Sequence, residues 1–304
     1  MLYIMHVLRK QKVTYTSYYN LNSRQTPPSR DRGFIFRLPI WLVIIIFCLL
    51  GLKLFDQVRS ADRASALETA AQHQAVSRDL GRDLKTLQAA NPQITYSISA
   101  IGLGDDDQVS LGNQAAMPAA SVGKLITATA FLHRVESHQA SLGQQLSGYQ
   151  ASDLLRQMIN QSDDGSWAIL NDYLGHPALD YYAHSLGLSS YSADTNTISA
   201  SDIAKLLRLL YEDKLLNAAH TRLLLSFMQN TNYENLITPA LPPGYTIYHK
   251  VGLDDDNVND AAIITHDNKA IVLVIFTDGH GVYNWPDRAA QMQTITRQAL
   301  KDYF

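Results

Sequence analysis

The stretch Pro118-Ala119-Ala120-Ser121-Val122-Gly123-Lys124 leads into an apolar-periodic segment, residues 122–136, that predicts a helix. Positions three apart share one face of a helix, so the Ser121 hydroxyl and the Lys124 amine are expected to point the same way. A serine becomes nucleophilic when a base takes its proton, and a lysine whose pKa is lowered by burial can be that base. Backbone N–H groups at the helix start would favour an oxyanion nearby. A helix cap beside a surface lysine gives the same pattern, so the pair alone decides little.

Two later segments extend this pattern. Ser162-Asp163-Asp164 lies between two helical stretches, and Lys250-Val251-Gly252 ends a strand-like run. The order S-x-x-K, S-D-x, K-x-G resembles the motif set of class A β-lactamases and penicillin-binding proteins. The resemblance covers residues 94–304, with each motif in the local structure that the family gives it.

The elements around the motifs predict an α+β fold. Strand-forming runs occur at both ends of the domain, and the middle, residues 152–230, is helical. An antiparallel sheet would be built from both ends and flanked by helices, with an all-helical lobe beside it. The expected strands are 94–103, 108–111, 245–252, 261–265 and 270–277, and a last helix opens at Pro286. This layout matches the β-lactamase/transpeptidase-like fold that the resemblance implies.

The resemblance implies acyl transfer through a serine ester. Ser121 would attack a carbonyl group, and Lys124 would accept or relay its proton. Ser162 would pass a proton to the leaving nitrogen, because a hydroxyl both donates and accepts. Lys250 would supply positive charge for a substrate carboxylate and help to lower the pKa of Lys124.

The resemblance also implies a binding site around the nucleophile. The oxyanion would lie between the backbone N–H groups of Ser121 and Leu253, the residue after the third motif. Gly252 would let the substrate backbone approach the strand closely. Strand alternation places Lys250 and Val251 on opposite faces, so the pattern leaves open where the lysine head group lies.

Two motif positions expected to contact the substrate depart from the family pattern. Asp164 replaces the usual asparagine, and its carboxylate adds negative charge near the two lysines, which could hold Lys124 protonated. Val251 replaces the usual threonine or serine, so one hydrogen bond to a substrate carboxylate is lost. The arginine that the family carries after this strand pair has no counterpart at residues 257–259.

A further departure concerns hydrolysis of the acyl-enzyme. Class A enzymes use a glutamate on a loop that follows a Leu-Gly-Leu-type segment, here Leu186-Gly187-Leu188. The stretch that follows, residues 189–197, is short and has Asp194 as its sole acid. Asp194 is a poor candidate for positioning the hydrolytic water, so slow turnover is expected and rapid penicillin or cephalosporin hydrolysis would contradict this prediction.

Two functional hypotheses follow. The first is a membrane-anchored serine hydrolase or acyl-transferase that forms an acyl-enzyme with a β-lactam, a peptidoglycan-type peptide or a related amide or ester. The second is a catalytically weak relative that serves as a binding or structural module at the cell envelope. Intact Ser121, Lys124, Ser162 and Lys250 favour the first, whereas Asp164, Val251 and the missing glutamate favour the second.

Composition narrows the alternatives. The 304 residues carry a formal net charge of −3, which gives no support for nucleic-acid binding. The single cysteine, Cys48, excludes an internal disulfide, and the histidine spacings do not suggest a metal site, so no metal or cofactor is expected. His249 is expected to be structural, on the face opposite Lys250. Residues 254–260 superficially suggest calcium binding, but they lack the EF-hand glycine and terminal glutamate and are interpreted as a solvated turn between strands, near the mouth of the site, whose aspartates could repel anionic substrates.

The N-terminal part predicts a membrane anchor. Residues 1–37 are polar and basic and are interpreted as a disordered cytoplasmic tail, and residues 38–55 as a transmembrane signal anchor with the rest of the chain outside. A signal peptide cleaved near Ala64-Ser65-Ala66 is the alternative. Residues 56–91 predict a helical stalk that could self-associate as a short coiled coil, and residues 92–304 form the catalytic domain.

Overall fold

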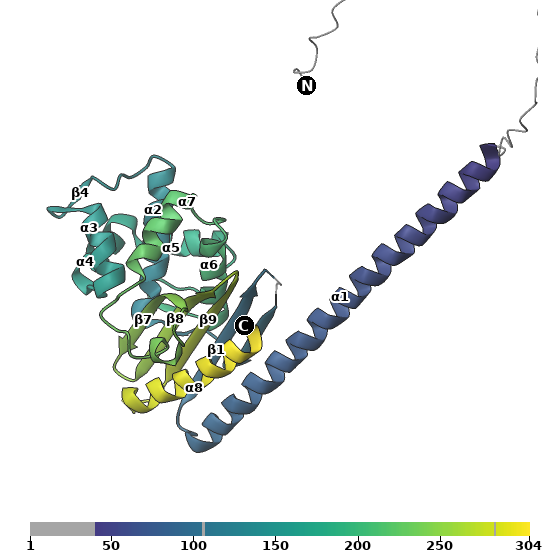
Figure 1. Ribbon diagram of the computed structural model, residues 1–304. Helices are drawn as coiled ribbons and strands as arrows, with labels where there is room; N and C mark the ends of the chain where they lie inside the picture. Colours follow the sequence, from purple (N-terminus) through teal and green to yellow (C-terminus); the bar gives the residue numbers. More distant parts are fainter. Residues whose placement is uncertain (1–39, 105–106, 283) are drawn as a thin grey trace, which may run out of the picture. The chain divides into compact units, whose positions relative to one another are not determined.

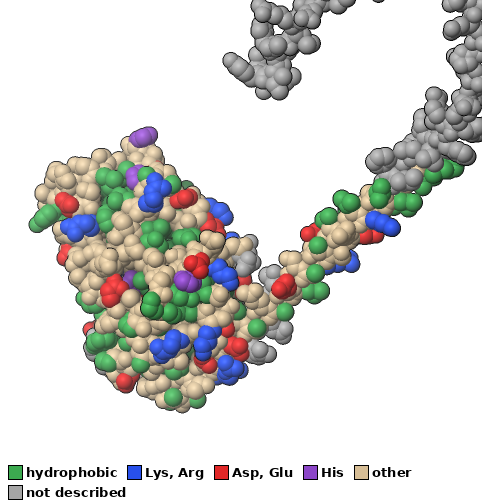
Figure 2. Space-filling view, viewed as in Figure 1, with side chains coloured by type: hydrophobic (Ala, Val, Ile, Leu, Met, Phe, Trp, Pro, Cys, Tyr) green, Lys and Arg blue, Asp and Glu red, His purple; other side chains and the backbone are tan. Residues whose placement is uncertain are grey.

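The computed structural model describes residues 40–104, 107–282 and 284–304, so the predicted cytoplasmic tail lies outside the described residues. One long helix, α1 (Ile40–Ala90), covers the described part of the predicted anchor, residues 40–55, and the predicted stalk up to residue 90 (Figure 1). Its final turns belong to the domain, because Val76, Leu80 and Leu84 are buried in a core cluster with residues of the sheet. Further upstream, hydrophobic side chains lie exposed along the helix (Figure 2). Val58 and Leu67 are among the exposed residues. Within the described ranges, no helix is both long and apolar enough to cross a membrane.

The domain is built on a five-stranded antiparallel sheet with strand order β2-β1-β9-β8-β7. Its strands are β1 (Thr95–Leu103), β2 (Gln108–Gly112), β7 (Thr246–Asp254), β8 (Asn257–His266) and β9 (Lys269–Asp278). Because β1 pairs along its whole length with β9, the start and the end of the domain meet in one sheet. The predicted α+β fold with a sheet assembled from both ends is confirmed.

Helices cover the two faces of this sheet. The end of α1 and α8 (Trp285–Tyr303) pack against one face, where Ala289, Met292 and Ile295 are buried (Figure 1). The other face carries the helical lobe, and α6 (Ala200–Tyr211) contacts β1 and β9. The remaining lobe helices are α2 (Lys124–Glu136), α3 (Ala151–Arg156), α4 (Asp164–Leu174), α5 (His176–Ser185) and α7 (Ala218–Phe227).

Shorter elements connect the lobe to the sheet. They are β3 (Met117–Pro118) paired with β6 (Thr197–Ile198), β4 (Gln145–Leu146) paired with β5 (Tyr149–Gln150), the 3₁₀ turns η1 (Ala120–Gly123) and η3 (Thr238–Ala240), and the π-helical turn η2 (Gln157–Gln161). The Ser199 hydroxyl caps α6 by accepting a hydrogen bond from the Asp202 N–H at 3.2 Å, while the Asp202 carboxylate accepts from Ser190. These connections bring η1, which carries the first motif, against β7, which carries the third, and the second motif lies between η2 and α4.

Candidate active site

The first motif lies at the junction of a 3₁₀ turn and a helix. Ser121 is within η1, and α2 begins at Lys124, two residues later than the periodicity predicted. Ala120 has a left-handed backbone, with φ of +48°, which turns the chain sharply before the serine. The Lys124 side chain is fully buried, and its Nζ lies 2.9 Å from Ser121 Oγ.

The second motif is presented by an unusual turn. The π-helical turn η2 ends at Ser162, whose φ of +59° is also left-handed, and α4 begins two residues later. The Asp163 carboxylate caps α4 by accepting a hydrogen bond from Ser166 N at 2.6 Å. Its pKa is lowered because Ser166 hydrogen-bonds the charged form. The left-handed turn places Ser162 against Lys124. Lys124 Nζ donates to the Ser162 carbonyl oxygen at 2.7 Å and lies 3.5 Å from Ser162 Oγ.

The third motif completes the cluster from the sheet. Lys250 on β7 is buried, and its Nζ donates to Ser162 Oγ at 2.8 Å and to the Val251 carbonyl oxygen at 2.9 Å. The Val251 side chain is buried in the core between the sheet and α8. It therefore offers no group to replace the hydrogen bond that a threonine or serine hydroxyl would make to a substrate. The structure thus brings Ser121, Lys124, Ser162 and Lys250 into one continuous chain of contacts.

Asp164 joins this chain directly. Its Oδ1 lies 2.5 Å from Lys124 Nζ, although 85% of its side-chain surface is exposed. The carboxylate therefore contacts the buried cluster on one side and solvent on the other. The Trp167 ring lies on the same side, with its centroid 5.2 Å from Lys124 Nζ. Trp167 is fixed by donating to Thr127 Oγ1 at 2.9 Å. The tryptophan therefore lines the cluster and shields the ammonium group.

Burial shifts both lysines away from their ordinary protonation behaviour. The pKa of Lys124 is lowered by desolvation, and the hydrogen bond and charge of Asp164 oppose that shift. The pKa of Lys250 is lowered to about 7, first by desolvation and then by the charge of Lys124, with Asp260 and Asp164 acting in the opposite direction. At neutral pH the site can therefore hold an uncharged amine, which a serine nucleophile needs.

Gly252 serves a contact within the protein. A Cβ at this position would lie 2.7 Å from the Ala119 carbonyl oxygen and 3.1 Å from Val122 N, so only glycine lets η1 pack on β7. The sequence interpretation assigned the close approach to substrate, whereas in the structure the turn that carries Ser121 occupies that space.

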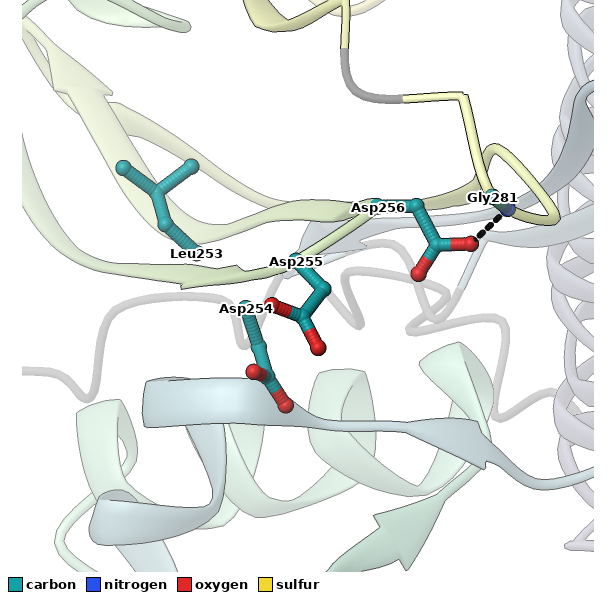
Figure 3. A pocket seen from close by; sticks show the side chains of 5 residues that line it. All are labelled: Leu253, Asp254, Asp255, Asp256 and Gly281. Atoms are coloured by element: carbon teal, nitrogen blue, oxygen red, sulfur yellow. Dashed lines mark hydrogen bonds between the residues drawn. The ribbon is translucent and has the colours of Figure 1, made fainter.

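Beyond Gly252, the strand leads into an open cavity of about 650 Å³ lined by Leu253, Asp254, Asp255, Asp256 and Gly281. Figure 3 shows the Asp254 and Asp255 carboxylates pointing to the same side, while the Asp256 carboxylate is turned to accept the Gly281 N–H. The backbone N–H of Leu253 is the predicted second oxyanion donor, so the aspartates lie next to the predicted site.

Asn259 is a site residue that the sequence interpretation missed. Its fully buried side chain on β8 donates to the Pro118 carbonyl oxygen at 2.9 Å and to the Ala119 carbonyl oxygen at 3.3 Å. Its Oδ1 accepts the N–H of Thr277 on β9 at 3.0 Å. The side chain therefore ties two strands to the turn before Ser121. The available signal was a polar residue just before the apolar run 261–264, but the two carbonyl groups to which it donates lie about 140 residues away in sequence.

The short loop before α6 holds the nucleophile turn from the other side. Asn196 donates from Nδ2 to the Ala120 carbonyl oxygen at 3.0 Å, and its own carbonyl oxygen accepts the Ala119 N–H at 2.9 Å. Asp194 is turned outward, with 79% of its side chain exposed, and pairs with His176 Nδ1 at 2.8 Å. The acid of this loop is therefore engaged by a histidine of α5.

His249 lies on the reverse face of β7. It is fully buried between Asp260, 3.1 Å from its Nδ1, and Glu234, 3.2 Å from its Nε2. Burial favours the neutral ring, but the two carboxylates outweigh burial and raise the pKa of His249 to about 10. In the ranges that the structure describes, no group of three or more His, Cys, Asp or Glu side chains, this one included, is placed to hold a metal ion.

Comparison with known proteins identifies the family. The pattern of the family described as "Beta-lactamase enzyme family" matches residues 79–303, which is most of the chain. The chain therefore belongs to this family and is a serine hydrolase, as the motifs predicted. No curated protein matches it.

Solved structures share the fold. PBP-A superposes with a TM-score of 0.69 at 23% identity, over 73% of this chain and 94% of its own. The "Ancestral (GNCA) Beta-lactamase class A" superposes with a TM-score of 0.67 at 18% identity, over 73% of this chain and 99% of its own. A β-lactamase from Xanthomonas campestris gives 0.68 at 19% identity, over 75% of this chain and 98% of its own.

Proposed function

We propose that Ser121 forms an acyl-enzyme with a β-lactam, a peptidoglycan-type peptide or a related amide or ester. The observation that carries this proposal is the contact chain from Ser121 Oγ to Lys124 Nζ, Ser162 Oγ and Lys250 Nζ, with successive separations of 2.9, 3.5 and 2.8 Å. Such a chain can withdraw the serine proton during attack and return a proton to the leaving group. The backbone N–H groups of Ser121 and Leu253 would stabilise the oxyanion.

We further propose that the acyl-enzyme is hydrolysed slowly. A point mutant of PBP-A, a fold relative, has been solved as an acyl-enzyme complex with penicillin G. Here the loop at 189–197 offers no glutamate, and its aspartate is paired with His176. An acyl group would then persist on the serine, or pass to an acceptor other than water.

We also propose that residues 38–55 anchor the chain in the cell membrane, with the N-terminus cytoplasmic and the catalytic domain outside. The apolar sequence of this segment and the basic residues before it support the proposal. The exposed Val58 and Leu67 side chains on α1 support self-association of this helix. Alkaline extraction of membranes tests anchoring, and sedimentation of the full chain beside a Val58→Asp, Leu67→Asp variant tests self-association.

The central experiment follows the intact mass of the full chain after exposure to a fluorescent penicillin. Acylation should add the mass of the penicillin to the wild type and not to a Ser121→Ala variant. Ser226→Ala, a surface serine on α7, is the matched control and should label like the wild type. Loss of the added mass over time reports deacylation. A wild type that takes no label from a penicillin or an activated ester would favour the binding module instead.

A further inference from the structure

The two lysines of the site have different neighbours. Lys124 Nζ is surrounded by Asp164 Oδ1 at 2.5 Å, the Ser162 carbonyl oxygen at 2.7 Å and Ser121 Oγ at 2.9 Å. An ammonium group has three N–H donors, and these three acceptors can take one each. The carboxylate is a full counter-charge in direct contact, so it stabilises the charged form of Lys124 against the burial that lowers its pKa.

Lys250 has uncharged hydrogen-bond partners. Its Nζ contacts Ser162 Oγ and the Val251 carbonyl oxygen, and 2% of the residue is exposed. A neutral amine satisfies both partners, because one N–H can donate to the carbonyl while the lone pair accepts the serine O–H. A buried ammonium without a carboxylate in contact is costly, so this environment favours the neutral form.

More distant charges do not reverse this difference. The charged groups that act on Lys250 are Lys124 on α2, Asp164 on α4 and Asp260 on β8. Asp260 is engaged by His249, and Asp164 by Lys124. The lowering of the pKa of Lys250 to about 7, with Lys124 charged beside it, agrees with the contacts.

We propose that Asp164 fixes the positive charge of the resting site on Lys124, and that Lys250 is the neutral amine that finally receives the proton of Ser121. This assignment rests on the proposed acyl-enzyme chemistry and reverses the roles that the sequence suggested for the two lysines. Asp164 is the residue that decides it, since an asparagine would offer Lys124 no counter-charge.

The proton then moves along contacts that already exist. The proton of Ser162 first passes to Lys250, and one proton of Lys124 passes to Ser162 Oγ, which leaves Lys124 as a neutral amine with a lone pair. As Ser121 Oγ bonds to the carbonyl carbon, its proton then passes to Lys124. The carbonyl π electrons move to oxygen. When the intermediate collapses, the bond to the leaving nitrogen breaks, its electron pair stays on nitrogen, and nitrogen takes a proton from Ser162, which Lys250 replaces. Lys124 therefore carries the same single positive charge before and after acylation.

Lys250→Arg separates this assignment from the usual one. An arginine keeps the positive charge but cannot lose its proton. If Lys250 serves as a cation, the variant should acylate within about tenfold of the wild type. If Lys250 receives the proton, acylation by a fluorescent penicillin should fall by at least about 100-fold, the usual contribution of a proton acceptor.

A second substitution distinguishes lost chemistry from a damaged fold. Removing the carboxylate with Asp164→Asn lets Lys124 shed its proton beside the new guanidinium, so the double variant should acylate at least about tenfold faster than Lys250→Arg alone. Asp163→Asn is the matched control, since it removes one charge from the adjacent residue, which contacts Ser166 rather than Lys124 and can still cap the helix. It should give much less rescue.

If the arginine variant does not fold, Lys250→Ala with added methylamine replaces it. Acylation should rise with the concentration of free methylamine, and a rate that follows methylammonium instead would overturn the assignment. An active Lys250→Arg variant, or no rescue by Asp164→Asn in a folded double variant, would overturn it and leave Ser121 chemistry standing. A wild type that is not acylated would overturn the proposed function and this assignment together.

Discussion

Replacing Asn259 by alanine should weaken both the domain and its reaction. The Asn259 amide is fully buried and serves the Pro118 carbonyl oxygen and the Thr277 N–H from one side chain. The substitution leaves both backbone groups without this partner in a site closed to bulk water. The affected turn leads directly into Ser121, so a loss of order there also reaches the nucleophile.

The magnitude follows from the two orphaned groups. An unsatisfied buried donor or acceptor costs about 1–3 kcal/mol, so the free energy of unfolding should fall by about 2–6 kcal/mol. For a domain of this size the melting temperature should drop by roughly 5–20 °C. Asn259→Asp should fare no better, because its carboxylate can accept from Thr277 but cannot donate to Pro118.

The assay is unfolding of the full chain in denaturant, followed by penicillin acylation at a temperature where the variant is folded. Acylation of the folded variant should be slower by at least about tenfold, since small misplacement of a nucleophile is costly. Ile263→Val, on the same strand, is the control and should lose about 1 kcal/mol with unchanged acylation. An Asn259→Ala variant within about 1 kcal/mol of the wild type, or one that acylates normally, would refute the reasoning.

Three further perturbations have defined outcomes. Gly252→Ala should slow acylation by at least about tenfold, because its Cβ would lie 2.7 Å from the Ala119 carbonyl oxygen. Gly143→Ala, where the added Cβ meets no close neighbour, should acylate like the wild type. Equal acylation rates for the two variants would show that η1 can shift freely. The folded pKa of His249, about 10, lies above its unfolded value, so its stabilisation is complete below about pH 6.5 and is lost as pH rises through 10. The difference in unfolding free energy between wild type and His249→Gln, at most about 5 kcal/mol, should therefore shrink between about pH 6 and 10, and a constant difference would contradict the assigned charge. Asp194→Asn should leave the deacylation rate within about twofold, because Asp194 pairs with His176 and points outward; a tenfold change in the mass time course would assign it to the water.

The fold could be predicted from the sequence because its signals are local. Alternating runs indicated the strands, and Pro286 marked the opening of the last helix, which the structure contains as α8. The start of α2 was placed two residues early, because a 3₁₀ turn and a first α-helical turn have nearly the same apolar spacing. The motif order was also readable, since each motif sits at the end of a recognisable element.

The geometry of the site could not be predicted in the same way. Strand alternation left the Lys250 head group open, and its position depends on a left-handed Ser162 that follows a π-helical turn, a conformation with no clear sequence signature. The contacts of Asn259 join residues on separate elements. The sequence did suggest that Asp164 could hold Lys124 protonated. That the two groups lie 2.5 Å apart, and that the hydrogen-bond partners of Lys250 are uncharged, depends on the folded structure.

The cost of burying charge links the stability of this site to its chemistry. Lys124 is 0% and Lys250 2% exposed, and each buried ammonium without a partner would cost several kcal/mol. Asp164 offsets one of them, while Asp260 is occupied by His249 on the other face of β7. The folded state with both lysines charged therefore has one cation too many, and releasing a proton from Lys250 relieves it. The neutral Lys250 amine that acylation requires is thus the form that the packed site already favours. A folded Lys250→Arg variant should have a measurably lower free energy of unfolding than the wild type, because its buried guanidinium cannot release a proton.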